Sequence, residues 1–226
     1  QPLRIYKLAG FRSTCTLSPA SHIGKWAINE PVYGKGYAWY DEDVDQTLAT
    51  GMNIVANLNT SRYNVAPEGL ELRQGKPNEK EIGHRKGNFP IAAWKRFVAA
   101  MAEHFRGRIR HWLVIDEPSA QYEAKEYFKL LKASYEVVKA ADPDNMVFMH
   151  THIVSNRGYI DALEELGASR YCDALWDYVR FREQAERLKT WSEKHGKPIW
   201  TVEYGGFRTF HVRDTSLHPL NEPFSL

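Results

Sequence analysis

The sequence predicts an α/β fold made of repeated βα units, of the TIM-type (β/α)8 barrel class. Apolar runs typical of strands begin near residues 10, 52, 109, 146, 172 and 198, and helical patterns alternate with them. Two of these strands end on a glutamate. Functional side chains at the C-terminal ends of parallel strands are typical of one site at one face of a βα barrel.

The barrel predicted here is incomplete. We count about six βα units, whereas a closed barrel has eight and typically about 250 residues. Before Gly10, only residues 3–8 could form the end of strand one or of its helix, and the stretch after Gly206 shows no convincing strand. We therefore expect residues 1–226 to form a single catalytic βα-barrel domain that carries strands two to seven. On this interpretation the sequence is truncated, and strands one and eight are missing.

The overall charge indicates neither a nucleic-acid partner nor a membrane surface, because the formal net charge is only +2. No apolar run approaches the roughly 18 residues that a membrane span needs. No signal peptide is recognisable, which leaves the compartment open. The sequence does not determine the oligomeric state. The chain has seven Trp and twelve Tyr, which serve as core and surface residues and also suit stacking against sugars.

Cys15 and Cys172 are the only two cysteines. They fall on the predicted strands two and six, which would not be neighbours in a barrel. Two buried free thiols are therefore expected in preference to a disulfide.

The first half of the chain alternates short elements with long connections. Residues 10–16 are predicted as a strand, residues 41–50 as a helix that Gly51 closes, and residues 52–58 as strand three. Residues 62–88 are polar and aperiodic, which is typical of an active-site loop or a partly disordered segment. A helix then opens near Pro90, with an apolar face of Ile91, Trp94, Phe97, Val98, Met101 and Phe105.

The second half repeats the unit three more times. Ser119 is predicted to cap a helix with one side formed by Tyr127, Leu131, Ser134 and Val138. Strand five begins at residue 146, and a short helix ends at Gly167. Residues 173–178 form strand six, and a helix with Ala185, Leu188 and Trp191 leads to the last strand.

Two carboxylates carry the functional prediction. The strand at residues 109–115 closes on Asp116-Glu117-Pro118, and the strand that starts at Pro198 ends on Glu203, followed by Tyr204 and two glycines. For either glutamate alone, a structural role as a helix cap or as the partner of an arginine is the favoured interpretation. Both together, each at a strand end, favour a shared catalytic site.

Further polar and aromatic side chains are predicted at the same barrel face. Asn57 lies at the end of strand three, and His150 and His152 lie at the end of strand five, on the same side of it. We expect these three to bind substrate hydroxyls, with Trp176 or Trp39 as a stacking surface. Alternate histidines can also bind zinc, but no third ligand is evident, so hydroxyl binding or core hydrogen bonding is favoured and no metal is predicted.

The two glutamate motifs resemble the acid/base and nucleophile signatures of clan A glycoside hydrolases, such as families 39, 42 or 5. Trp112 to Pro118 nearly matches W-x-x-x-N-E-P, and Thr201 to Gly205 matches T-E-x-G with one residue inserted before Glu203. Asn29-Glu30-Pro31 is a more literal match to the first signature. It does not follow an apolar strand, so we do not assign it as the catalytic motif.

The resemblance implies a retaining β-glycosidase that needs no cofactor, with Glu117 as acid/base and Glu203 as nucleophile. It implies that Arg12 and Tyr178 hold Glu203 ionised and oriented, although the sequence alone fits a surface or structural role for Arg12 equally well. Asp116 stands where the clan has an Asn that hydrogen-bonds the sugar 2-hydroxyl, and an Asp cannot donate an amide proton. The histidine that the clan often has on strand six is not matched.

Two other functions stay open at this point. Asp116 and the unmatched histidine favour a barrel that has lost catalysis and only binds carbohydrate, whereas the retention of both glutamates disfavours it. A metal-dependent barrel hydrolase that uses His150 and His152 is the weaker alternative. A carbohydrate is the expected partner in the favoured reading, and a polysaccharide-degrading enzyme would favour a secreted or periplasmic location.

Overall fold

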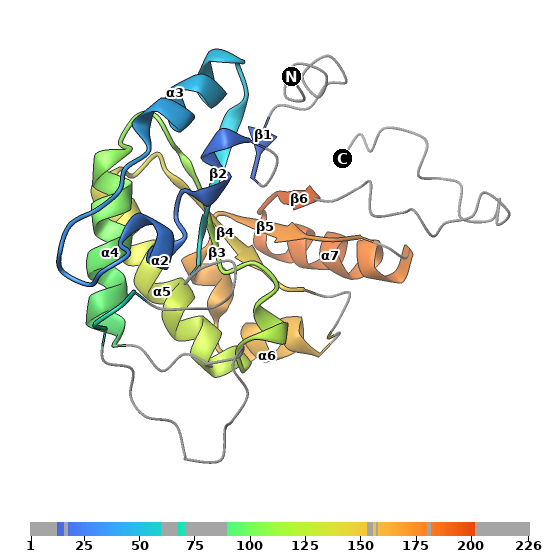
Figure 1. Cartoon of the computed structure of the whole chain (residues 1–226). Helices are drawn as coiled ribbons and strands as arrows, with labels where there is room; N and C mark the ends of the chain where they lie inside the picture. Colours follow the sequence, from blue (N-terminus) through green and yellow to red (C-terminus); the bar gives the residue numbers. More distant parts are fainter. Residues whose placement is uncertain are drawn as a thin grey trace, which may run out of the picture.

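A computed structural model describes residues 13–15, 18–59, 67–70, 90–152, 156, 158–179 and 182–201 of the chain. These residues include six strands that form one parallel sheet, in which each strand lies beside its neighbours in the sequence (Figure 1). The strands are β1 (Ser13–Thr14), β2 (Asn53–Leu58), β3 (His111–Val114), β4 (Met146–His150), β5 (Ala174–Asp177) and β6 (Ile199–Thr201). This order confirms the predicted fold class: the described residues form an incomplete (β/α)8 barrel.

Helices connect the strands and cover the outer face of the sheet. The longer ones are α3 (Asp41–Ala49), α4 (Ile91–His104), α5 (Ala124–Ala141) and α7 (Arg182–His195). The short ones are α2 (Trp26–Asn29), α6 (Tyr159–Glu165) and the 3-10 helices η1 (Pro19–His22), η2 (Pro118–Ala120) and η3 (Ala168–Tyr171). Figure 1 shows α4 and α5 side by side against the sheet. No helix among the described residues is long and apolar enough to cross a membrane.

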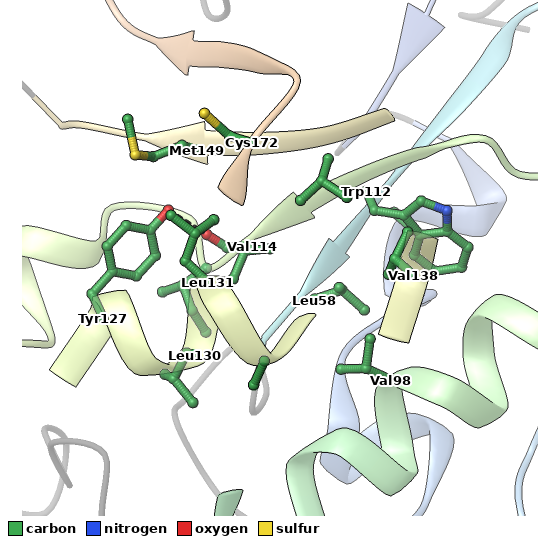
Figure 2. Packing of buried hydrophobic residues seen from close by; sticks show 14 of the residues in the cluster. Leu58, Val98, Trp112, Val114, Tyr127, Leu130, Leu131, Val138, Met149 and Cys172 are labelled. Carbon is green, nitrogen blue, oxygen red and sulfur yellow. Dashed lines mark hydrogen bonds between the residues drawn. The ribbon is translucent and has the colours of Figure 1, made fainter. Parts of the chain in front are cut away.

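The outer face of the sheet forms the main core. Successive side chains of a strand point to opposite faces, so Trp112 and Val114 of β3 both face the helices, together with Leu58 of β2. Figure 2 shows these residues packed with Val98 of α4 and with side chains of α5, which include Leu131 and Val138. The apolar face predicted for the helix that opens near Pro90 is confirmed, since Trp94, Phe97, Val98, Met101 and Phe105 are fully buried.

The inner face of the sheet forms a second, smaller apolar cluster of Val55, Leu113, Phe148, Ala174 and Trp176. These residues occupy the alternate strand positions, so the cluster is the barrel interior. Two register pairs show how the strand ends align: Leu58 lies beside Val114, and His150 lies beside Trp176.

The predicted cap at Ser119 is wrong. Pro118 instead starts the short 3-10 helix η2, and α5 begins only at Ala124, with Glu123 at the N-cap position. The buried side predicted for this helix is confirmed, because Tyr127, Leu131, Ser134 and Val138 are all buried. The Tyr127 hydroxyl donates a hydrogen bond to the Val114 carbonyl at 3.0 Å, which ties α5 to the end of β3.

Both cysteines are free, as predicted. Cys172 is buried but precedes β5, and Cys15 directly follows β1 and is only partly buried. Burial raises the pKa of the Cys172 thiol to about 12. One further difference concerns α7, which buries Gln184 rather than the expected Ala185.

The segment that contains Asn29-Glu30-Pro31 is part of the core. The Glu30 side chain is 0% exposed. It accepts hydrogen bonds from the Trp26 indole N–H and the Gly34 backbone N–H, each at 2.7 Å. The Arg96 guanidinium of α4 donates to both Glu30 carboxylate oxygens, at 2.5 and 2.6 Å. Glu30 therefore has a structural role.

Candidate active site

Polar residues from three neighbouring strands meet at the C-terminal end of the sheet. Asp116 and Glu117 follow β3, His150 ends β4 and is followed by His152, and Tyr178 follows β5. Because the strands are parallel and in sequence order, these residues share one edge of the sheet. The structure thus brings together five of the predicted site residues.

Glu117 presents its carboxyl group to solvent. Its side chain is 52% exposed, and its Oε1 lies 3.8 Å from His152 Nε2. Its backbone is fixed from behind, because the Glu117 N–H donates a hydrogen bond to His150 Nδ1 at 3.0 Å. A carboxyl group that is accessible while its main chain is held has the arrangement that an acid/base catalyst needs.

Unusual backbone conformations concentrate around Glu117. Among the described residues, only four non-glycine residues have a positive φ, and three of them are Ile115 (53°), Glu117 (49°) and His152 (50°). This region is costly for side chains with a Cβ, and for a β-branched residue such as Ile115 it is rare. Strain of this kind persists where surrounding contacts enforce it, and it clusters at functional sites.

Asp116 is tied to its neighbours through one carboxylate oxygen. Its Oδ1 accepts a hydrogen bond from the Tyr178 hydroxyl at 3.0 Å and lies 3.1 Å from His150 Nδ1. Burial works to raise the pKa of the Asp116 carboxyl, but the hydrogen bond and charge of His150, with the Tyr178 hydroxyl, outweigh it. The net effect is a lowered pKa, which keeps Asp116 ionised at neutral pH.

His150 Nδ1 has two partners that make opposite demands. It must offer a lone pair to accept from the Glu117 N–H, and it must carry a proton to donate to Asp116. The two contacts are therefore alternatives that the tautomer of His150 selects. The imidazole is fully buried, and its Nε2 lies 3.7 Å from Asp177 Oδ1.

The predicted hydroxyl-binding roles of His150 and His152 stay predictions. The structure adds that the two rings pack edge-on at a centroid distance of 5.4 Å and that each also meets the Tyr178 ring edge-on. Behind them, the Thr151 hydroxyl donates to the buried Asp177 carboxylate, which also accepts the Tyr178 N–H at 2.8 Å. These contacts lock the ends of β4 and β5 together.

Asn57 and Trp176 both lie on the inner face of the sheet. Asn57 is 7% exposed, and its buried Oδ1 has no hydrogen-bond partner among the described residues. Trp176 is 6% exposed and packs edge-on against Phe148 at a centroid distance of 5.7 Å. Their predicted substrate contacts remain open, and the orphaned Asn57 oxygen is a polar atom that a ligand hydroxyl could satisfy.

Trp39 lies away from this site. Its ring stacks on the His104 imidazole at a centroid distance of 3.9 Å. His104 is the last residue of α4, and only residues 105–110 separate it from the start of β3. Trp39 is therefore near the N-terminal end of the sheet, opposite Glu117, and of the two proposed stacking residues only Trp176 is near the candidate site.

Arg12 and Glu203, the two other predicted site residues, lie outside the described residues. Their predicted roles stay predictions. The described part of β6 ends at Thr201, whose register partner is Asp177. Asp177 in turn directly precedes Tyr178 in the sequence.

Ser119 is a site residue that sequence reasoning missed. Its hydroxyl lies 2.7 Å from His152 Nδ1. From the sequence alone, a serine two residues after this glutamate is interpreted as a helix cap. In the structure its hydroxyl contacts a histidine that is 33 residues away in the sequence. Its closeness in sequence to Glu117 was the only signal available.

No group of three or more His, Cys, Asp or Glu side chains within the described ranges is arranged to hold a metal ion. One nitrogen of each of the two site histidines contacts protein groups. His150 Nδ1 contacts Glu117 and Asp116, and His152 Nδ1 contacts Ser119.

Comparisons with known proteins place the fold. The sequence matches no model of a known protein family and no curated protein sequence. Solved structures do match. A GH10 endoxylanase retrieved from a sugarcane soil metagenome has a TM-score of 0.58 at 16% identity, over 89% of this chain and 61% of that chain.

Two further solved structures are similar to this chain to a comparable degree. A GH39 β-xylosidase from Caulobacter crescentus has a TM-score of 0.56 at 19% identity, over 80% of this chain and 44% of its own. A glucosidase from Croceicoccus marinus has a TM-score of 0.51 at 17% identity, over 74% of this chain and 38% of that chain. This chain therefore spans between 38 and 61% of these three proteins. At such identities the likeness shows the shared barrel fold.

Proposed function

We propose that the protein is a glycoside hydrolase: a retaining β-glycosidase that hydrolyses a β-linked oligo- or polysaccharide by double displacement. The observation that carries the proposal is Glu117, an exposed carboxyl group on a fixed, left-handed backbone at the C-terminal end of β3. The solved structures of the same fold include a xylanase, a xylosidase and a glucosidase. They support a role in carbohydrate degradation.

Glu117 is the acid/base in this proposal. It protonates the leaving oxygen in the first step and then removes a proton from the attacking water in the second step. Its exposure lets the carboxyl group reach a glycosidic oxygen, and His150 holds the main chain in place in the tautomer that accepts the Glu117 N–H. Glu203 attacks the anomeric carbon and forms the glycosyl-enzyme. A retaining enzyme needs the two carboxyl groups about 5–5.5 Å apart.

The remaining site residues bind and orient. Arg12 keeps Glu203 ionised. The Tyr178 hydroxyl has one proton, which it donates to Asp116 in the structure, so Tyr178 assists Glu203 only when it turns from that contact. Asp116 keeps one carboxylate oxygen for a sugar hydroxyl, because its known contacts all use Oδ1. Asn57, His150 and His152 bind further hydroxyls, and Trp176 provides an apolar surface for the sugar ring.

The two glutamates can be distinguished by chemical rescue. Glu203→Ala should abolish turnover of every substrate, since no glycosyl-enzyme can form, and added azide should then give a glycosyl azide of inverted configuration. Glu117→Ala should still form the intermediate with activated aryl leaving groups and show a burst. Azide should then give a product of retained configuration. Product configuration is measured by proton NMR.

Two results would contradict this assignment. Identical behaviour of the two variants, or exchanged azide configurations, would mean that the roles are wrong. A wild-type protein that binds oligosaccharides but turns over no aryl β-glycoside and releases no reducing ends from polysaccharides would favour the binding-only barrel. Asp116, which replaces the clan's Asn, is the residue that favours this second candidate.

A further inference from the structure

Asp116 has one carboxylate oxygen bound by protein groups and one available to a ligand. Its Oδ1 accepts the Tyr178 hydroxyl at 3.0 Å and lies 3.1 Å from His150 Nδ1. Among the described residues, no side chain or backbone group donates a hydrogen bond to Oδ2. The Asp116 side chain is 28% exposed. A ligand at this end of the sheet can therefore donate a hydrogen bond to Oδ2.

Asp116 also has no permanently charged partner within the described part of the chain. Asp173, a carboxylate of similar exposure (26%), forms an ion pair with Lys139 at 3.3 Å. No described lysine or arginine forms such a pair with Asp116. The groups near it that can become positive are His150 and His152, and an imidazole can also be neutral at physiological pH. The site thus has a carboxylate that a cationic ligand can pair with.

The chemistry of this carboxylate selects the donor. The contacts of His150 and Tyr178 outweigh burial and lower the pKa of the Asp116 carboxyl, so it is ionised at neutral pH. An ionised carboxylate only accepts hydrogen bonds, and a bond from a charged donor is roughly twice as strong as one from a neutral donor. An ammonium group is therefore a better partner for Oδ2 than a hydroxyl group.

The place of Asp116 indicates which substituent of a sugar it meets. Glu117, the proposed acid, is the next residue, and both approach His150 Nδ1, Asp116 through Oδ1 and Glu117 through its backbone N–H. A sugar whose glycosidic oxygen lies at Glu117 therefore has its anomeric carbon near Asp116. The two ring atoms bonded to that carbon are the ring oxygen and C2, and only C2 carries a group that can donate a hydrogen bond.

We propose that Asp116 makes the site selective for a β-linked amino sugar, whose free ammonium group on C2 binds Oδ2. The preferred substrate class is then a 2-amino-2-deoxy-β-glycoside rather than the corresponding neutral glycoside. This inference rests on the proposed glycosidase function and extends it, because that function gives Oδ2 a sugar hydroxyl without naming the sugar. Acetylation of the amine removes its charge and should remove the preference.

The test uses aryl β-glycosides that differ only at C2, which carries a hydroxyl, an ammonium or an acetamido group, in the gluco and galacto series. Asp116→Asn should lower kcat/KM for the ammonium substrate by about 5–50-fold relative to the hydroxyl substrate, because a charge-assisted hydrogen bond becomes a neutral one. The intrinsic reactivity of the glycosides cancels when this ratio is compared between two enzymes. The fraction of folded enzyme cancels as well, so a loss of stability does not affect the result.

A matched variant and a change of salt separate a local contact from a general charge effect. Asp173→Asn removes the same charge from a carboxylate of similar exposure, which precedes β5 at the opposite end of the sheet. It should leave the substrate ratio unchanged. Raising the ionic strength should reduce the wild-type preference for the ammonium substrate, since salt screens a partly exposed charge pair. The ratio for Asp116→Asn should stay nearly constant.

The outcomes distinguish this inference from the proposed function. A wild type that hydrolyses the hydroxyl substrate, with a substrate ratio that Asp116→Asn does not change, would overturn the amino-sugar selectivity and leave the glycosidase intact. An equal fall of the ratio in Asp173→Asn would overturn it too. A protein that hydrolyses none of the glycosides would overturn the proposed function, and the selectivity with it. A fall that is specific to Asp116→Asn and to the ammonium substrate would establish the selectivity.

Discussion

Glu30 and Glu117 have nearly the same sequence neighbours but opposite surroundings. Each precedes a proline and follows an Asn or an Asp. Glu30 is 0% exposed, and both its oxygens are bound by Trp26, Gly34 and Arg96. Glu117 is 52% exposed, and its backbone N–H donates to His150 Nδ1. A short motif therefore indicates a candidate catalytic glutamate only together with the element that precedes it.

The element before each motif explains the difference. Glu117 follows a parallel strand, so the chain emerges at the edge of the sheet where the polar side chains meet. Glu30 follows the single-turn helix α2, which packs into the core beside α4 through Trp26. There a carboxylate is stable only if all its lone pairs are satisfied, and four donor contacts provide that.

The largest expected effect is on the kcat of a Glu117 variant. Glu117→Gln should lower kcat for substrates with poor leaving groups by about 10²–10⁴-fold, because an amide cannot act as a general acid. Its free energy of unfolding should change by less than about 0.5 kcal/mol, since the carboxyl group is exposed. Steady-state kinetics and urea unfolding measure the two quantities. A large loss of stability with unchanged kcat would reverse the roles assigned to the two glutamates.

Glu30→Gln should show the opposite pattern. In glutamine an NH2 group replaces one carboxylate oxygen, and it cannot accept a hydrogen bond. Arg96 and one other buried donor, either the Trp26 indole or the Gly34 N–H, therefore lose their acceptor. We expect the free energy of unfolding to fall by about 2–4 kcal/mol. The lower end is favoured because Arg96 is 39% exposed. The kcat of the remaining folded enzyme should be unchanged, and a fall in kcat without a fall in stability would place Glu30 in the site.

The smallest expected effect concerns the residue before each glutamate. Asn29 uses its amide at both ends, accepting from the Gly24 N–H and donating to the Ala38 carbonyl. Asp116, by contrast, uses an ionised carboxylate. Burial raises the pKa of this carboxyl group, but the contacts of His150 and Tyr178 outweigh burial, so the pKa is lowered overall. Asp116→Asn should therefore destabilise the protein by about 1 kcal/mol at pH 7.

The pH dependence of that effect has a definite sign. A carboxyl group whose pKa is lowered on folding adds stability above its unfolded pKa, about 3.9, and loses it as the pH falls through the folded value. The stability difference between wild type and Asp116→Asn should thus shrink below about pH 4. Urea unfolding at a series of pH values measures it. A difference that grows on acidification would contradict the direction of the pKa shift.

Much of the fold followed from the sequence, because apolar periodicity depends on local burial. The strand predicted at residues 109–115 agrees with β3 to within two residues at each end, and the helix predicted to open near Pro90 begins at Ile91. Glu117, Asp116, His150, His152 and Tyr178 were also predicted to share one face. Their strand positions are enough for that inference once the parallel order is assumed.

The interactions within the site could not be predicted in the same way. Ser119 has the residue type and position of a helix cap, and only the tertiary structure brings His152 to it. Similarly, nothing local indicates that His150 accepts the Glu117 N–H, since the two residues are 33 apart in sequence. Hydrogen bonds between strand ends depend on register and backbone turns, which a one-dimensional pattern does not specify.

The left-handed backbone at Ile115, Glu117 and His152 has a consequence for how this protein can evolve. Each such residue costs roughly 1–3 kcal/mol of conformational free energy, and glycine or asparagine would relieve part of it. At position 115 the relieved strain would be outweighed, because Ile115 is fully buried in the main core and its removal would leave a cavity. At position 152 the replacement would lose the 2.7 Å contact with the Ser119 hydroxyl. Core packing therefore maintains the turn that presents Glu117, and at position 115 heat resistance and retention of turnover favour the same residue.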